Sequence, residues 1–141
     1  MSDFSIPLRL RGYSMKPAIL SFIFALMVTT IAYAELPSSK DAAIRAALTS
    51  GKPTVADFGA RTCIPCKKMA PILEELNREL KGKANVTFTD VWATPALAQD
   101  YRVQMIPTQI FFDAKGKEVT RHMGFMDKAD ILKALKKAGM Q

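Results

Sequence analysis

The two cysteines of the chain, Cys63 and Cys66, are three positions apart where an apolar run gives way to a helical pattern. The run Thr54–Phe58 predicts a buried strand, which breaks at Gly59 into a short loop. Residues three apart on a helix face the same way, and the free N–H groups and positive dipole of a first turn favour a thiolate. A Cys-X-X-Cys thiol placed there can have its pKa lowered from about 8.5 to between roughly 3.5 and 7.5. The spacing therefore predicts a redox-active thiol pair.

Such a pair can exchange disulfides with a substrate. We expect Cys63, nearer the loop, to be the exposed nucleophile, and Cys66, one turn into the helix, to be the shielded resolving thiol. Cys63 would form a mixed disulfide, which Cys66 resolves by forming the Cys63–Cys66 bond and releasing the reduced substrate. Arg61, Lys67 and Lys68 add positive charge nearby, either to tune the thiols or as a solvated basic face.

Two other uses of a cysteine pair fit the sequence poorly. A zinc site needs about four ligands, usually Cys or His, and His122 is the only histidine. By the loop-entropy model, a structural disulfide that closes so short a loop gains only about 2 kcal/mol before strain is subtracted. We therefore expect neither a metal nor a cofactor at this site.

The segment Asp57–Lys67, DFGARTCIPCK, resembles the active-site segment of the thioredoxin family, and Ile106-Pro107-Thr108 resembles its cis-proline loop. The resemblance covers roughly residues 38–139. It implies that substrate contacts come from Ile64, Pro65, Ile106 and Pro107. A substrate chain would pair as a short extra strand along the backbone of Ile106.

Asp57 lies in the predicted central strand, where a carboxylate is costly unless it has a role or a partner. The resemblance implies that Asp57 is buried behind the cysteine pair, has a raised pKa and accepts the proton of Cys66 through water. The alternative is an aspartate near a strand end that hydrogen-bonds the loop.

Within the family, Pro65 before the second cysteine and the acid Asp57 resemble the reducing members. Thr62 and Ile64 depart from the Trp and Gly that thioredoxins usually have, which changes the expected substrate surface. The resemblance therefore implies a protein-disulfide reductase. The alternatives are a net oxidant of exported proteins and a non-catalytic binding module whose cysteine pair senses redox state.

Residues 1–34 read as a secretory signal peptide. Arg9, Arg11 and Lys16 precede an almost entirely apolar stretch at 18–31, and Ala32-Tyr33-Ala34 forms a cleavage signal. Met15 is an alternative translation start. An uncleaved membrane anchor is the other reading, but the stretch is shorter than the roughly 20 residues that a spanning helix prefers. We therefore expect a periplasmic or secreted protein whose residues 35–141 form one thioredoxin-like domain.

Export defines the expected partners. A working dithiol in an oxidising compartment needs electrons from outside it, so we expect a membrane electron-transfer protein as reductant. Exported proteins with disulfides, including apocytochrome c, are the expected substrates of a monomeric enzyme. The net charge of +7 comes without an aromatic-basic motif, so we expect no nucleic acid partner.

The remaining pattern predicts an α/β fold in the order α-β-α-β-α-β-β-α. A central mixed sheet of four strands, or five if the segment before the first helix adds one, would be flanked by helices on both faces. Trp92 and Tyr101 are expected to be packing residues. Besides the strand at 54–58, the pattern predicts strands at 85–91, 108–112 and 118–122. The predicted helices, with their capping residues included, are 38–48, 63–80, 94–101 and 127–138.

Overall fold

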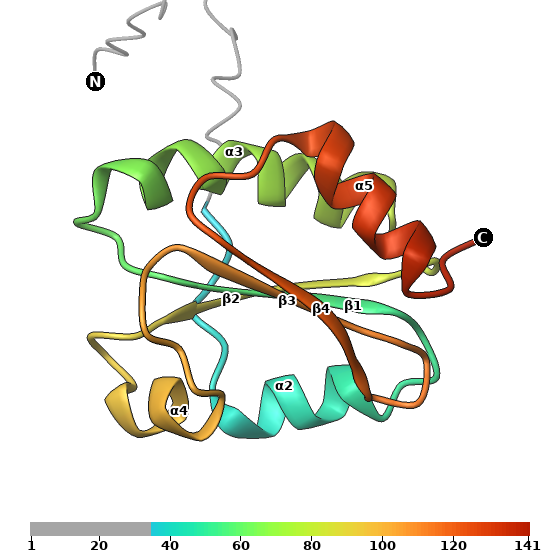
Figure 1. The fold of residues 1–141 in the computed structure, drawn as a ribbon, viewed down its shortest axis with the longest axis horizontal. Coiled ribbons are helices and arrows are strands. Elements are labelled where there is room, and N and C mark those ends of the chain that lie inside the picture. Colours follow the sequence, from blue (N-terminus) through green and yellow to red (C-terminus); the bar gives the residue numbers. More distant parts are fainter. Residues whose placement is uncertain (1–34) are drawn as a thin grey trace, which may run out of the picture. The chain divides into compact units, whose positions relative to one another are not determined.

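The computed structural model describes residues 35–141; the predicted leader lies outside the described residues. Four strands form one sheet, with α3 and α5 on one face and α2 and α4 on the other (Figure 1). The elements are α2 (Asp41–Leu48), β1 (Thr54–Gly59), α3 (Ile64–Glu79), β2 (Asn85–Asp90), α4 (Pro95–Asp100), β3 (Thr108–Phe112), β4 (Glu118–Met123) and α5 (Lys128–Lys137). Their order is the predicted one, and no helix among these is long and apolar enough to cross a membrane.

The sheet is mixed, with the strand order β2-β1-β3-β4. β1 pairs with β2 in parallel and with β3 in antiparallel, and β3 pairs with β4 in antiparallel. β1 is buried at every position, as expected for a strand with a neighbour on each side and helices on both faces. Its carboxyl end leads directly to the cysteines.

Alternation along β1 sorts its side chains between two cores. Val55 packs in the cluster under α3 and α5, with Leu73 and Ile131, whereas Ala56 and Phe58 pack in the cluster over α2 and α4. Asp57 therefore points to the face covered by α3, the helix that carries the cysteines.

The start of α2 differs from the prediction. Ser38 or Ser39 was expected to cap this helix, but α2 begins at Asp41, and Lys40 at its N-cap makes no side-chain cap bond. The serines are used elsewhere: Ser38 Oγ accepts from the N–H of Asp90, and Ser39 N–H donates to the carbonyl of Phe88. The fifth strand is reduced to one bridge beside the edge of β2, between Ser38 and Phe88.

The two aromatic residues expected in the core behave differently. The Tyr101 ring packs between Phe58 and Phe112, with ring centroids 5.1 and 6.2 Å away. Trp92 is 70% exposed just past the end of β2, so the prediction that it packs internally is wrong.

Candidate active site

Cys63 and Cys66 form a disulfide at the start of α3, with their Cα atoms 5.2 Å apart. Cys63 is the N-cap residue of this helix, and its Sγ accepts from the backbone N–H of Cys66 over 3.3 Å. Cys63 is partly exposed, whereas Cys66 is only 5% exposed. An outer sulfur that receives a helix N–H beside a shielded inner sulfur is the arrangement that an attacking and a resolving thiol require.

Gly59 gives the disulfide its room beneath α3. A Cβ at this position would lie 3.3 Å from Cys66 Sγ and 3.2 Å from Phe88 Cε2. Both distances are shorter than ordinary van der Waals contact. The last residue of β1 therefore brings the backbone close behind the inner sulfur.

We expect Gly59→Ala to lower the free energy of unfolding of the oxidised protein by about 1–2 kcal/mol, since overpacking a filled site typically costs that much. Urea denaturation measures the change. Ala42→Ser, on an exposed position of α2, is the control and is expected to stay within about 0.5 kcal/mol of wild type. An unchanged midpoint for Gly59→Ala would show that Phe88 and Cys66 move aside freely.

Asp57 is fully buried and shares one hydrogen bond with Gln109, its register partner on β3. Gln109 Nε2 donates to Asp57 Oδ1 over 2.8 Å. Burial raises the pKa of Asp57 from 3.8 to about 7, and the hydrogen bond from Gln109 opposes that rise. A carboxyl group that titrates near neutral pH is suited to exchange protons with a thiol.

A small cavity lies on the other side of Cys66, toward the edge of β2. Its volume of about 20 Å³ is enough for roughly one water molecule, and Cys66, Ala60, Leu73 and Phe88 line it. Asp57 is not part of this lining. The cavity therefore places a water-sized space against the inner sulfur but does not extend to the carboxyl group.

Pro107 lies opposite the end of β1. The register pairs Thr108 with Phe58, so its continuation by one residue brings Pro107 against Gly59. The Ile106–Pro107 peptide bond is cis, as the family resemblance implied. On its other side, Gly124 donates its N–H to the carbonyl of Pro107 over 2.8 Å, in a backbone conformation with φ of 100° that favours glycine.

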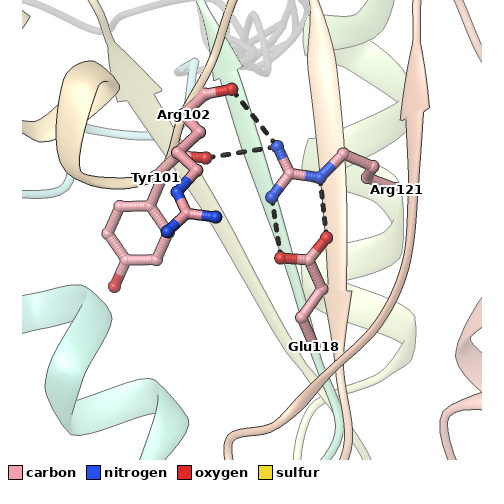
Figure 2. Close-up of polar contacts among 4 residues, drawn as sticks. All are labelled: Tyr101, Arg102, Glu118 and Arg121. Carbon is pink, nitrogen blue, oxygen red and sulfur yellow. Dashed lines mark hydrogen bonds and ion pairs between the residues drawn. The ribbon is translucent and has the colours of Figure 1, made fainter.

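Arg121 on β4 hydrogen-bonds the start of the segment that connects α4 to Pro107 (Figure 2). Its Nη1 donates to the carbonyls of Tyr101 and Arg102, over 3.2 and 3.4 Å, at the end of α4. Nε and Nη2 bind both carboxylate oxygens of Glu118, at 2.6 and 2.7 Å. Arg121 could not be identified from the sequence, since the two carbonyls that it binds lie about 20 residues upstream and only the fold brings them close.

Of the basic residues near the cysteines, Arg61 has structural partners. It forms an ion pair with Glu35, donates to the carbonyl of Leu36 over 2.8 Å and lies over the ring of Phe88, 5.1 Å from its centroid. Lys67 and Lys68 are exposed. Arg61 therefore holds the chain before α2 against the sheet edge, in addition to any effect of its charge on the thiols.

Exposed apolar side chains lie on the chain segments that adjoin Cys63, Gly59 and Pro107. Ile64 follows Cys63 and is 72% exposed, and Met123, paired in register with Thr108, is 55% exposed. We call the set the apolar rim; its members are Ile64, Trp92, Met105, Met123 and Phe125. Trp92, Met105 and Ile106 also line a groove of about 250 Å³. Sequence reasoning identified Ile64 and missed the other four, because exposure of an apolar residue leaves no local signal.

The chain matches the family model described as "Thioredoxin" over residues 36–137. It is 42% identical over 81 residues to a thioredoxin of Staphylococcus aureus, a match that covers 57% of this chain and 77% of that protein. It is 41% identical over 88 residues to a bifunctional thioredoxin reductase/thioredoxin of Mycobacterium leprae, which covers 62% of this chain and only 19% of that longer protein.

Two solved structures have the same fold. A mutant thioredoxin from Halobacterium salinarum superposes with a TM-score of 0.67 and 26% identity, over 77% of this chain and 94% of that one. Chloroplastic thioredoxin z superposes with a TM-score of 0.64 and 27% identity, over 74% of this chain and 95% of the other. Each similarity spans most of the part of the chain that the structure describes.

Proposed function

The chain belongs to the thioredoxin family, and we propose that it reduces disulfides of exported proteins through Cys63 and Cys66. The observation that carries this proposal is the disulfide at the N-terminus of α3, whose outer sulfur is partly exposed and accepts a helix N–H. That geometry fits a thiol–disulfide oxidoreductase, and the net direction toward reduction is our inference from Pro65 and Asp57.

The reaction begins with the reduced pair. The Cys63 thiolate attacks one sulfur of the substrate disulfide and forms a mixed disulfide, and the other substrate sulfur leaves as a thiolate and is protonated. Asp57 then takes the proton of Cys66, and the Cys66 thiolate attacks Cys63 Sγ. The substrate leaves as a second thiol. Two electrons have passed from the enzyme dithiol to the substrate disulfide.

The apolar rim supports an extended substrate segment with apolar side chains beside its cysteine. Among residues 35–141, neither the N–H nor the carbonyl of Ile106 takes part in a hydrogen bond. They are free to pair with the backbone of a substrate, as in strand addition. The two methionines of the rim, Met105 and Met123, are flexible and polarizable, which suits a surface that accepts varied side chains.

An exported location is proposed from residues 1–34 alone. Outside the cytoplasm the enzyme would need a membrane electron-transfer protein to return its disulfide to the dithiol. Apocytochrome c, whose cysteines must be reduced before haem attachment, is our proposed substrate among exported proteins. A monomer suffices for this chemistry, since both cysteines and Pro107 come from one chain.

We expect Cys66→Ser to accumulate a mixed disulfide with a protein substrate. Without the resolving thiol, the adduct on Cys63 cannot be released by the enzyme itself. The reduced variant is mixed with insulin, quenched by alkylation and examined by non-reducing electrophoresis and mass spectrometry. The expected product carries an insulin chain and is reversed by dithiothreitol.

The double variant with serine at both positions is the matched control and should form no adduct. Absence of an adduct with Cys66→Ser as well would reject the proposed activity. A measured reduction potential decides the direction: a value near about −270 mV supports a reductase, and one near about −120 mV identifies a net oxidant. In the native host, the same Cys66→Ser variant would retain its natural substrates for identification.

A further inference from the structure

Gln109 is a buried amide in the middle of the sheet, directly beside Asp57. β1 and β3 pair the two residues in register, and both are completely buried. Its neighbours along β3, Ile110 and Phe111, fill the two apolar cores. A buried amide costs free energy unless its polar atoms are paired. Its one hydrogen bond, from Nε2 to Asp57 Oδ1, links it to the proposed base and to nothing else in the described residues.

Two of the four buried side-chain atoms that lack a hydrogen-bond partner in the described residues belong to this pair. Within residues 35–141, neither Asp57 Oδ2 nor Gln109 Oε1 has a hydrogen-bond partner. Both are acceptors while the carboxyl group is ionised, so neither can satisfy the other. A proton on Oδ2 turns that oxygen into a donor, and Oε1 is the acceptor still free. An amide can therefore serve both protonation states: it donates to the carboxylate and can accept from the acid.

We propose that Gln109 is a positioning residue for proton transfer between Cys66 and Asp57. Its amide holds Oδ1, which leaves Oδ2 as the oxygen that takes and returns the proton. The inference rests on the proposed function, in which Asp57 is the base for the resolving thiol. The Cys66 proton moves to Oδ2, the Cys66–Cys63 bond forms as the bond to the substrate sulfur breaks, and the departing substrate thiolate takes up a proton.

The surroundings of Asp57 make the contribution of Gln109 measurable. The register partner of Asp57 on β2 is the apolar Phe88, and the core cluster on the same face of the sheet, under α3 and α5, is apolar. Cys66 on α3 holds no proton in the disulfide. The pKa of Asp57 has two causes, burial and the hydrogen bond from Gln109; Glu74, also buried on α3, does not contribute. Loss of the amide should therefore appear directly in the titration of this carboxyl group.

Gln109→Met tests the inference, since methionine keeps the length of the side chain but cannot donate. In the oxidised protein we expect the pKa of Asp57, followed by carbon NMR of its carboxyl group, to rise by about one unit. The pH at which resolution of the mixed disulfide is half-maximal, measured in a single turnover, should rise with it. Thr89→Val is the matched control. Thr89 is also fully buried, and its Oγ1 also lacks a partner, but it pairs with Phe58 and so faces the opposite core.

A second substitution keeps the test decisive if Gln109→Met does not fold. Gln109→Glu places two carboxyl groups side by side, so that one proton is shared and the apparent pKa values separate by more than about one unit. An unchanged titration of Asp57 in either folded variant overturns the inference, as does an equal shift in Thr89→Val. The NMR titration needs no turnover. A failed trapping experiment with Cys66→Ser therefore rejects the proposed function, whereas a normal trap with an unshifted Asp57 rejects only the role of Gln109.

Discussion

Asp57→Asn is expected to raise the free energy of unfolding of the oxidised protein by about 4 kcal/mol at pH 8.5 and to leave it nearly unchanged at pH 3.5. The pKa of Asp57 is raised from 3.8 to about 7 because its carboxyl group is buried. Between these values the folded protein keeps a proton that the unfolded chain has released. The contribution of the protonated Asp57 carboxyl group to the free energy of unfolding is complete below about pH 4 and is lost as the pH rises through about 7.

The size of the expected change in the free energy of unfolding follows from the difference between the pKa of Asp57 in the folded protein and in the unfolded chain. A shift of about three pKa units corresponds to about 4 kcal/mol at alkaline pH, at about 1.4 kcal/mol per unit. Asparagine has nearly the same shape and does not ionise, and its amide oxygen can still accept from Gln109. Urea denaturation of the oxidised proteins across this pH range measures the difference.

Asp100→Asn is the matched control, since it removes the same charge from an exposed position on α4. We expect it to remain within about 0.5 kcal/mol of wild type throughout the range. Equal effects of the two substitutions would mean that net charge, and not the buried carboxyl group, governs the pH dependence. A constant difference between Asp57→Asn and wild type would mean that the pKa of Asp57 is not raised in the folded protein.

The fold could be predicted because most of its signals are local. β1 is a short apolar run that ends at Gly59, and α3 has an apolar stripe at helical spacing that includes Leu73 and Leu76. Asp127 was expected to cap the last helix, and its side chain does accept from the N–H of Asp130. Such patterns depend on residues within about one turn of one another, which is what a sequence displays.

The parts that escaped prediction depend on distant residues. Gln109 lies 52 positions from Asp57, and nothing in the run around it shows that β3 pairs with β1 at that register. Ser38 was assigned to a helix cap, which is a local use, but it accepts from Asp90 across the edge of β2. Trp92 was expected inside because aromatic residues usually are, and only the position of β2 in the sheet shows that it stands at the rim.

The cysteine pair is a functional feature that could be predicted locally, since the three-residue spacing of Cys63 and Cys66 at a helix start indicates their chemistry. Cys63 and Cys66 are joined in the structure at the helix start where the pattern placed them. Their surroundings could be inferred only in part: the family resemblance pointed to Pro107, but the hydrogen bonds from Arg121 on β4 to the end of α4 depend on the fold. Local sequence thus predicts the reacting atoms, while partners such as Gln109 and Arg121 emerge only from the three-dimensional pairing of the strands.

Cys63→Ser is expected to reduce the rate of insulin reduction, with dithiothreitol as electron donor, by about a thousandfold or more. That loss corresponds to at least about 4 kcal/mol of transition-state stabilisation, because a serine hydroxyl cannot form the mixed disulfide. Precipitation of the reduced insulin B chain measures the rate. Lys68→Ser, which changes an exposed residue of the same helix to serine, is the control and should retain most of the activity.

The comparison with Cys66→Ser separates the roles of the two sulfurs. Both variants should lose turnover, but only Cys66→Ser can bind a substrate covalently, since Cys63 is the partly exposed sulfur that receives the helix N–H. A non-catalytic redox sensor would show no insulin reduction in the wild-type protein, so there would be no rate for Cys63→Ser to lose. An adduct formed on Cys66 of the Cys63→Ser variant, and not on Cys63 of Cys66→Ser, would reverse the assignment. The burial of Cys66 in the first turn of α3, against Gly59, argues against that reversal, because a protein disulfide could not approach its sulfur.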